Sequence, residues 1–445
     1  MTENYMIIPD DVLEVVKTLQ RNAWEAYLVG GSVRDLLMNR VPSDYDVATS
    51  AQTSEIKACF SRCVPVGEKH GTIAVLTGHR TVEVSTYKGQ GRLGAEKRPG
   101  IENDLLFRDF TINAMAMDEC GKVIDPYGGL EDLRHQMLRA PAGQARDRIV
   151  EDPLRMMRAV RFCSTLGFEL HPELRQAIAE NCGLLAGVAV ERIRAELNHI
   201  LISERPAAGI RFLLQTGLMD YVIPELLPMA GFDQRNIRHD KDVLEHSLAV
   251  VEGVPPRLNV RLGALLHDVA KPRTCTVDES GVGHFYSHHL GGREMAKNIL
   301  NRLKYDKQTI DDVVILVGEH MSRFAKIRDV GLKKLVNRVG EHNLEDLYDL
   351  QKADIMGSAP PFDFSGLEWM QSRIKQILYE KPPLSVKDLA INGNDLIELG
   401  FTPGPVMGRI LNDLLEMVLE DADRNERAFL INKASEYLPS VNHSS

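Results

Sequence analysis

Two aspartates near the N-terminus have the spacing of a metal-binding pair. Asp44 and Asp46 follow a Gly-Gly turn in the segment LVGGSVRDLLMNRVPSDYDVA. On a strand, side chains at i and i+2 point to the same side, and Mg²⁺ prefers hard carboxylate oxygens. Such a pair supports attack of a hydroxyl on the α-phosphate of a nucleotide, with pyrophosphate leaving. A polar turn explains either motif alone, but their close spacing favours the catalytic interpretation.

The residues around this pair suit a triphosphate. Gly30 and Gly31 let the backbone approach phosphate closely, and N–H groups at a helix start can face its oxygens. Arg34 adds a guanidinium group. Glu83, in TVEVSTY, would face away from its valine neighbours and is a candidate third carboxylate; a solvated strand residue is the alternative.

An arginine-rich stretch provides a second set of candidates. The segments FRDFTINAMA and EDPLRMMRAVRF contain Arg108, Asp109, Asn113, Asp152, Arg155, Arg158 and Arg161. Helical spacing would stack Glu151, Arg155 and Arg158 on one face. An Asp–Arg pair can read the edge of a base in place of a template. Asp152-Pro153 is equally a helix-start signal, and the arginines could form a solvated face.

The third set of candidates lies in a helical, histidine-rich region. Its members are His246, His267, Asp268, His288, His320 and Asp354. Imidazole and carboxylate groups together bind divalent metals. A lone histidine on an apolar helix is usually a core residue; a divalent-metal site, either catalytic or structural, is the other interpretation of this set.

The apolar spacing predicts the elements that position these residues. We expect an α+β chain, with a small mixed sheet and helices up to residue 139 and helices afterwards. Residues 10–22 read as a first helix, and TIAVLT and TVEVSTY read as a hairpin. A helix pair broken at Gly217 is expected within the helical part. The domain boundaries fall at 1–139, 140–205, 206–380 and 381–445.

Composition indicates an ordinary globular protein of several domains. The chain has 445 residues, with 44% hydrophobic and 26% charged residues. The net charge of −10 argues mildly against a generic nucleic-acid binder, although arginines cluster between Arg134 and Arg161. Six scattered cysteines indicate a reducing compartment. We expect no signal peptide and no membrane partner, and therefore a cytoplasmic protein.

Taken together, these motifs resemble the bacterial tRNA nucleotidyltransferases, the CCA-adding family of the polymerase-β-like superfamily. LVGGSVRDLLM…SDYDVA is similar to the family's metal-binding motif, FRDFTINAMAMD to its second motif and EDPLRMMRAVRF to its nucleotide-selecting motif. VERIRAEL and NGNDLIELGFTPGPVMGRIL resemble further segments. The resemblance covers nearly the whole chain and implies a head (1–139), a neck (140–205), a body (206–380) and a tRNA-binding tail (381–445).

The resemblance also implies roles for the candidate residues. Asp44 and Asp46 would bind magnesium, with Glu83 as a further catalytic candidate. The implied nucleotide site contains Gly30, Gly31, Arg34, Arg108, Asp109, Asn113, Asp152, Arg155, Arg158 and Arg161. In that site Asp152 and Arg155 would pair with the incoming base. The implied partners are tRNA and CTP, with ATP if the terminal A is also added.

Three departures from the family pattern bear on specificity. Phe107 stands where arginine is usual, and Pro153 stands where alanine is usual. The segment YKGQGRLGAEKRPGIENDLLFRDF is shorter than the flexible loop expected there, which resembles the specialised CC-adding enzymes. We therefore expect template-independent CC addition from CTP, with full CCA addition from CTP and ATP as the alternative and A addition third.

The order H…HD…D in the body, within about residues 239–360, resembles the HD phosphohydrolase superfamily. It implies a second divalent metal held by His246, His267, Asp268 and Asp354. His288 and His320 match places where some members add ligands or phosphate contacts. An HD phosphohydrolase with an inert RNA-binding head is an alternative function for the chain. A poly(A) polymerase and a non-catalytic tRNA-binding protein are further alternatives, disfavoured by the tail segment and by the intact aspartate pair.

Overall fold

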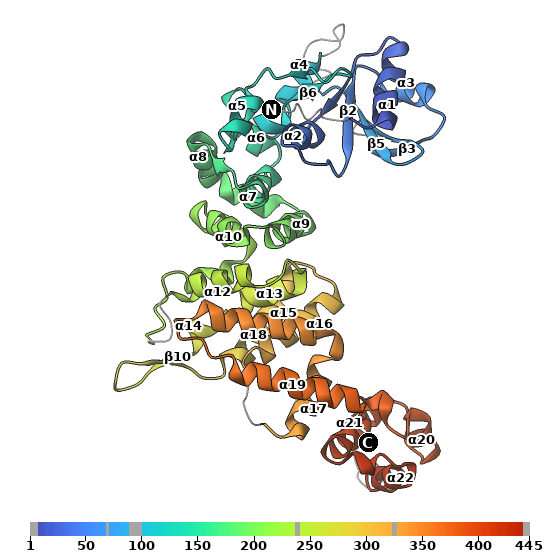
Figure 1. The fold of residues 1–445 in the computed structure, drawn as a ribbon, viewed down its shortest axis with the longest axis vertical. Coiled ribbons are helices and arrows are strands. Elements are labelled where there is room, and N and C mark those ends of the chain that lie inside the picture. The colour runs from blue at the N-terminus through green and yellow to red at the C-terminus, as the bar shows by residue number, and fades with distance from the viewer. Residues whose placement is uncertain (1–7, 68–70, 89–99, 236–240, 323–326, 439–445) are drawn as a thin grey trace. The chain divides into compact units, whose positions relative to one another are not determined.

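The chain folds as two compact units in a computed structural model (Figure 1). The structure describes residues 8–67, 71–88, 100–235, 241–322 and 327–438. One unit comprises residues 1–200 and 208–222, and the other comprises 201–207 and 223–445. The predicted α+β class is confirmed, and residues 208–222, which we assign to the body, cluster with the first unit. The segment whose shortness favours CC addition lies partly in residues 89–99, outside the described residues.

The head contains a seven-stranded mixed sheet in the order β3-β4-β5-β2-β1-β6-β7. Its strands are β1 Ala26–Val29, β2 Tyr45–Thr49, β3 Cys63–Gly67, β4 Thr72–Leu76, β5 Thr81–Thr86, β6 Ala116–Met117 and β7 Val123–Ile124. Only β2 and β5 run parallel; the other neighbours in the sheet are antiparallel. The expected hairpin is confirmed as β4–β5.

The two faces of the sheet have different coverings. The head helices are α1 Asp10–Arg21, α2 Gly31–Leu37, α3 Thr53–Cys59, α4 Ile101–Leu106, the 3₁₀ turn η2 Thr111–Asn113 and α5 Gly129–Arg134. On one face, Val47 packs in the same core as residues of α1 and α3. On the other face, Ala48 packs with Leu105 of α4. Because side chains alternate along a strand, Asp46 shares the α4 face with Ala48.

Helices follow the head in both units. Those up to residue 222 are α6 Ala145–Glu151, α7 Leu154–Leu166, α8 Pro172–Asn181, α9 Val190–Leu201, α10 Pro206–Gln215 and α11 Met219–Val222, with η3 Pro141–Gly143 and η4 Cys182–Gly187 between them. The break at Gly217 between α10 and α11 is confirmed. The neck is not wholly helical, because β9 Glu169–Leu170 pairs with β8 Met137–Leu138.

The second unit is built mainly of helices around a buried core. Its helices are α12 Val243–Gly253, α13 Leu258–Leu266, α14 Lys271–Thr274, α15 His288–Arg302, α16 Lys307–Glu319, α17 Asp329–Val339, α18 Leu344–Gly357, α19 Ser365–Glu380, α20 Gly393–Glu398, α21 Pro405–Glu420 and α22 Arg427–Ser435. Short 3₁₀ turns are η5 Pro224–Met229, η6 Glu341–Asn343, η7 Val386–Asp388 and η8 Ala422–Arg424. A hairpin of β10 Cys275–Val277 and β11 Gly283–Phe285 interrupts the predicted all-helical body.

Local capping explains where two body helices begin. The Asp242 carboxylate accepts from the Glu245 N–H at 2.7 Å at the start of α12. Asp306 accepts from the Thr309 N–H at 3.0 Å at the start of α16. Such caps satisfy N–H groups that a helix start leaves unpaired, and they fix the helices that carry His246 and end beside His320.

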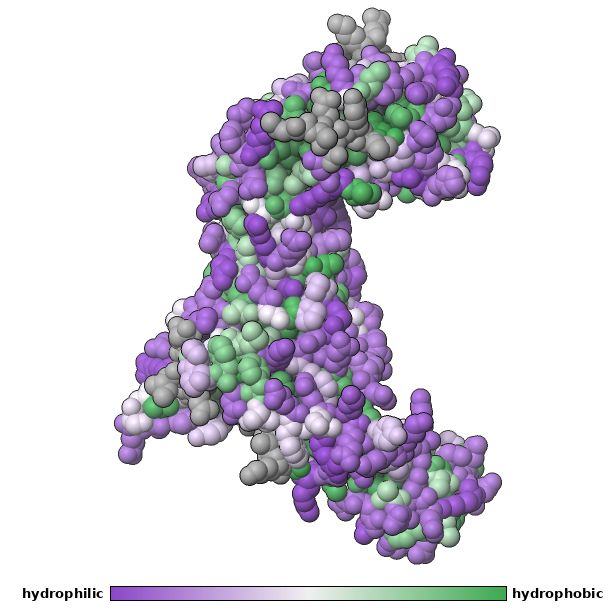
Figure 2. All heavy atoms as spheres, in the orientation of Figure 1, coloured by the Kyte–Doolittle hydropathy of each residue, from purple (hydrophilic) through white to green (hydrophobic). Residues whose placement is uncertain are grey.

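Hydrophilic residues dominate the visible surface of each unit (Figure 2). None of the helices in the described part of the chain has both the length and the apolar character that a bilayer crossing requires.

Candidate functional site

Asp46 and Glu83 lie side by side in the head sheet. They are direct partners in the register of the parallel β2–β5 pair. Asp44 immediately precedes β2, is exposed and accepts from the Ser43 hydroxyl at 3.0 Å. Burial raises the pKa of Asp46 to about 6; Arg108 opposes the rise, and the charges of Asp44 and Glu83 add to it. A bound cation would reduce the electrostatic repulsion between these carboxylates, so this donor set fits Mg²⁺.

Gly30 brings the backbone against these charged groups. Its φ of 74° lies in the region that favours glycine. A Cβ there would lie 2.6 Å from Nη1 of Arg108 and 3.6 Å from Oδ2 of Asp46. Arg108 is held by Asp104, which is 2% exposed and accepts from its Nη2 at 3.1 Å. The Gly-Gly turn thus leaves room beside Asp46, and Gly31 begins α2 as expected.

A chain of hydrogen bonds joins the second motif to the nucleotide-selecting helix. Nη1 of Arg34 donates to Oδ1 of Asn113 at 2.8 Å, and Nδ2 of Asn113 donates to Oδ1 of Asp109 at 2.9 Å. Asp109 also accepts from Nε of Arg158 at 2.8 Å. Burial alone would raise the pKa of Asp109, but Arg158, Asn113 and the Phe110 N–H lower it to about 2. The ionised Asp109 carboxylate therefore connects the second motif, in the head, to helix α7 of the neck.

Three arginines converge on one aromatic ring. The guanidinium carbons of Arg161, Arg34 and Arg158 lie 4.7, 5.1 and 5.8 Å from the centroid of Phe162. Phe162 is 5% exposed, and Phe110 meets it edge-on at 5.7 Å. Cation–π attraction can hold guanidinium groups against a ring, so Phe162 is a platform for three guanidinium groups. Each of them is also paired with a carboxylate, that of Asp35, Asp109 or Glu196.

Asp152 and Arg155, which are expected to recognise the base, form hydrogen bonds within the chain. Asp152 accepts from Arg192 at 3.1 Å and from the Leu154 N–H at 3.3 Å. Arg155 donates to the carbonyl of Phe107 at 3.1 Å. Base reading by Asp152 and Arg155 stays a prediction.

One expectation about this segment is wrong. Glu151 does not share a helix with Arg155 and Arg158, because it ends α6 and α7 begins at Leu154. Proline at 153 disfavours the helical conformation of the residue before it, and Asp152 is extended, with φ −143° and ψ 97°. Glu151 nevertheless bonds Arg155 across the break at 2.8 Å.

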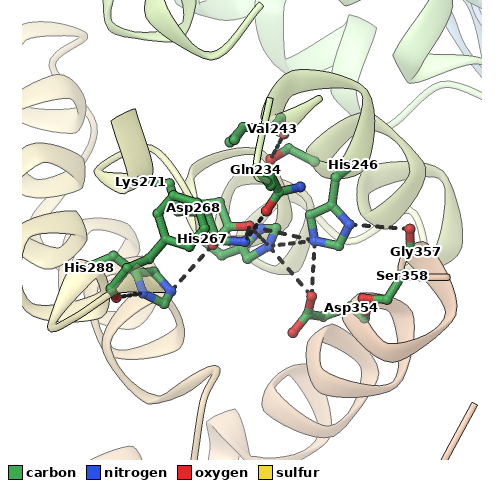
Figure 3. A network of polar contacts seen from close by, with 12 residues as sticks. Gln234, Val243, His246, His267, Asp268, Lys271, His288, Asp354, Gly357 and Ser358 are labelled. Atoms are coloured by element: carbon green, nitrogen blue, oxygen red, sulfur yellow. Dashed lines mark hydrogen bonds and ion pairs between the residues drawn. The ribbon is translucent and has the colours of Figure 1, made fainter. Parts of the chain in front are cut away.

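The body brings all six predicted histidine and aspartate residues together. Figure 3 labels His246, His267, Asp268, His288 and Asp354 among them. Two groups of three have ligand atoms within 4.8 Å of one another, and every member is buried: His246, His267 and Asp354, and Asp268, His288 and His320. Nε2 of His246 lies 3.0 Å from Oδ1 of Asp354 and 3.4 Å from Nε2 of His267. Nε2 of His288 lies 3.2 Å from Nε2 of His320.

The opposite ring nitrogen of each histidine faces a backbone carbonyl. The Nδ1 atoms of His246, His267, His288 and His320 lie 3.2, 2.8, 2.8 and 2.7 Å from the carbonyl oxygens of Gly357, Ala264, Phe285 and Val317. A carbonyl only accepts, so each Nδ1 donates, and in the neutral form of each ring Nε2 presents its lone pair inward. This is the arrangement of metal-ligating histidines.

Charges in the cluster act differently on its members. Burial lowers the pKa of His320 to about 3 and also lowers that of His288, so both imidazoles are neutral at pH 7. Burial alone would lower the pKa of His267. The negative charges of Asp268 and Asp354 have the larger effect, so its pKa is raised. A bound cation would balance the two buried carboxylates of Asp268 and Asp354. The donor set therefore fits a divalent metal.

An open pocket of about 910 Å³ leads to this cluster. Its lining includes Asp268, His288, His320 and Asp354, together with Lys271 and Phe362. Nζ of Lys271 donates to Oε1 of Gln234 at 2.8 Å and lies 2.7 Å from Oδ2 of Asp268. Lys271 and Gln234 thus orient the Asp268 carboxylate.

Sequence reasoning missed several residues that build these sites. Asp104 precedes Arg108 by four residues, a helical ion-pair spacing that could have identified it. Phe162 follows Arg161 directly, but nothing in the spacing indicates that three arginines meet its ring. Arg192 is 40 residues from Asp152, and no local pattern connects them.

Three family models match parts of this chain. Residues 26–139 match the family model described as the poly A polymerase head domain. Residues 167–229 match "Probable RNA and SrmB- binding site of polymerase A", and residues 284–434 match a model for tRNA nucleotidyltransferase domain 2.

Relatives and solved structures extend the match over the whole chain. The CCA-adding enzyme of Lactobacillus johnsonii is 32% identical over 438 residues, covering 97% of each chain. The crystal structure of the Bacillus stearothermophilus CCA-adding enzyme in complex with CTP aligns with a TM-score of 0.73 and 29% identity, covering 99% of this chain and 100% of that one. The Thermotoga maritima CCA-adding enzyme complexed with tRNA shares the fold, with a TM-score of 0.58, 21% identity and coverage of 98% and 97%. From its head motifs to its tail, the chain belongs to the family of CCA-adding enzymes, the bacterial tRNA nucleotidyltransferases.

Proposed function

We propose that this protein adds two C residues to the 3′ end of tRNA, using CTP and Mg²⁺, without a template, and releases pyrophosphate. The observation that carries the proposal is the register of Asp46 with Glu83, with Asp44, Arg108 and Gly30 around them. The CTP bound by the Bacillus stearothermophilus relative supports the choice of nucleotide.

Different residues of the chain have different roles in the transfer. Arg34, Arg158 and Arg161, held against Phe162, bind the triphosphate. Asp44 and Asp46 hold Mg²⁺, which when bound stabilises charge on the α-phosphate and on the leaving oxygen. Gly30 admits the nucleotide beside them.

Base selection falls to Asp152 and Arg155 in this proposal. Both carry hydrogen-bonding groups that match the edge of a pyrimidine or purine. For base pairing, Asp152 exchanges its contact with Arg192, whose side chain is 54% exposed, for the base.

Full CCA addition from CTP and ATP is the second candidate. The relatives named as CCA-adding enzymes favour it. The short segment before the second motif favours CC addition.

Product sizes distinguish these candidates. A tRNA transcript lacking CCA, and transcripts ending in C or CC, are incubated with CTP, ATP or both. Growth by two residues with CTP, and no further growth when ATP is added, is expected. Growth by three with both nucleotides supports CCA addition instead, and long homopolymer tails would contradict both.

We also propose a metal-dependent phosphohydrolase site in the body, with His246, His267, Asp268 and Asp354 as ligands. The inward Nε2 atoms, each opposite a carbonyl-bound Nδ1, carry this proposal. Hydrolysis of p-nitrophenyl phosphate and of its bis-ester should require added divalent metal and should disappear in His267→Ala and Asp268→Ala. Equal hydrolysis by the variants and the unaltered protein would contradict the assignment.

A further inference from the structure

A cavity of about 430 Å³ opens in the head beside the start of β1 and the start of α4. Its walls include Glu25 and Tyr27 at the start of β1, Glu102 and Asn103 of α4, and Tyr127 after β7. The described lining shares no residue with the proposed nucleotide and metal sites. The cavity is therefore a separate feature of the head.

Aromatic rings in and behind this cavity are fixed by their neighbours. Tyr27 and Tyr127 pack against the same small core as Tyr87, which is 3% exposed. The Tyr127 hydroxyl donates to the Glu102 carbonyl at 3.0 Å, and the Tyr87 hydroxyl donates to Oε2 of Glu25 at 3.2 Å. A tyrosine is thus held beside each of the two glutamates.

The charges around the cavity are negative. In the part of the chain that the structure describes, neither Glu25 nor Glu102 forms an ion pair with a lysine or an arginine. Burial raises the pKa of Tyr27, and the nearby carboxylates of Glu25, Glu119 and Asp118 add to the rise. The cavity therefore repels anions such as nucleotide phosphates and attracts cations.

Rings and carboxylates together favour one class of cation. The face of an aromatic ring attracts an organic ammonium group, and its apolar carbons cover the alkyl chain. Carboxylates accept charge-assisted hydrogen bonds from an ammonium N–H. Mg²⁺ instead requires an octahedral shell of oxygen ligands, which aromatic rings do not supply.

We propose that this cavity binds a small alkylammonium ion, with its ammonium group bonded to the carboxylates of Glu25 and Glu102 and its alkyl carbons against Tyr27 and Tyr127. The inference goes beyond nucleotide transfer and does not depend on the proposed functions of the head and the body.

Ligand-observed NMR of the full-length protein tests the proposal, with n-butylammonium as the probe. Saturation transferred from the protein to the butyl protons, measured over a range of probe concentrations, gives Kd. Glu25→Gln and Tyr27→Leu should each raise Kd at least about fivefold, because each removes one of the two attractions. Tyr27→Phe keeps the ring and should stay within about twofold.

Matched controls define the chemistry and the place of binding. 1-Butanol, which has the same chain without the charge, should receive little saturation, and an equal concentration of K⁺ should not displace the probe. Tyr286→Leu, at a tyrosine of the body that is 70% exposed, and Glu14→Gln, at an exposed carboxylate of α1, should leave Kd unchanged. Circular dichroism should show that all variants are folded.

Four results would overturn the proposal. No saturation transfer to n-butylammonium means that the cavity does not bind it. Equal saturation of 1-butanol means that the carboxylates do not select a charge, and displacement by K⁺ means that the rings do not select an organic ion. A Kd unaffected by both Glu25→Gln and Tyr27→Leu means that the probe binds elsewhere on the protein.

Discussion

The head and the body both gather candidate metal ligands, but they do so in opposite ways. In the body, six buried ligand residues converge, and backbone carbonyls fix the orientation of all four imidazoles. In the head, Asp44 is exposed, and Asp46 and Glu83 are neighbours because they are paired in the register of strands β2 and β5. If both sites bind metal as we propose, the ligands of the body site are in place before any substrate arrives, whereas the head site presents carboxylates to a cation that arrives with phosphate oxygens.

This difference follows from the ligands that each chemistry needs. Mg²⁺ in phosphoryl transfer is typically held by one or two carboxylates together with substrate phosphates. Imidazole sites for transition metals depend on second-shell groups that fix the ring. The body should therefore retain metal without substrate, and the head should bind metal tightly only with nucleotide.

The largest expected effect separates the two sites. Asp46→Ala should reduce tRNA extension at least ~10³-fold, because it removes several kcal/mol of transition-state stabilisation. Its body metal content, measured on the same preparation, should not change. Glu14→Gln, at an exposed carboxylate of α1, is the control. Extension within tenfold of the unaltered protein would show that the head metal is misassigned.

The second largest effect is expected from replacing Phe162, the ring against which three arginines pack. Phe162→Leu should raise KM for CTP about 10- to 100-fold, since each desolvated cation–π contact contributes up to about 2 kcal/mol. Phe162→Tyr keeps the ring and should stay within about threefold. The kcat of both variants should change less than KM in steady-state extension assays. Equal impairment by leucine and tyrosine would indicate a packing role alone.

Acid should weaken the link between head and neck through Asp109. Its pKa in the fold is about 2, below the ordinary value near 3.9. A lowered pKa means that its contribution is fully present above about pH 4 and is lost as pH falls toward 2. The contribution should be about 2 kcal/mol, and Asp109→Asn should remove it.

Urea unfolding at pH 3, 5 and 7 measures this contribution. The difference between the unaltered protein and Asp109→Asn should shrink as pH falls. Glu131→Gln, at an exposed carboxylate, should show no such convergence. A difference that grows toward pH 3 would contradict the sign of the pKa shift.

The smallest expected effect concerns the partner of Asp152. The side chain of Arg192 is 54% exposed, and such surface ion pairs contribute at most about 1 kcal/mol. Arg192→Ala should therefore change kcat/KM for CTP by less than about fivefold. A change above 50-fold would mean that Arg192 itself contacts the substrate.

Residues that form a local pattern could be predicted from the sequence, whereas their contacts with distant segments could not. Asp44 and Asp46 follow from i, i+2 spacing beside a Gly-Gly turn, and the body histidines follow from the order H…HD…D, which resembles that of a known superfamily. The neighbours of Glu83, the platform at Phe162 and the Arg192–Asp152 contact depend on tertiary packing. The helix break at Pro153 was visible in the sequence, but helical spacing wrongly carried Glu151 across it.

One measurement tests most directly whether nucleotide transfer is independent of the body site. The Asp268→Asn protein, at full length, is assayed for extension of a tRNA lacking CCA, and its bound metal is counted. The account predicts loss of body metal with an extension rate within about twofold of the unaltered protein. Loss of extension as complete as that of Asp46→Ala would contradict the separation of the two sites.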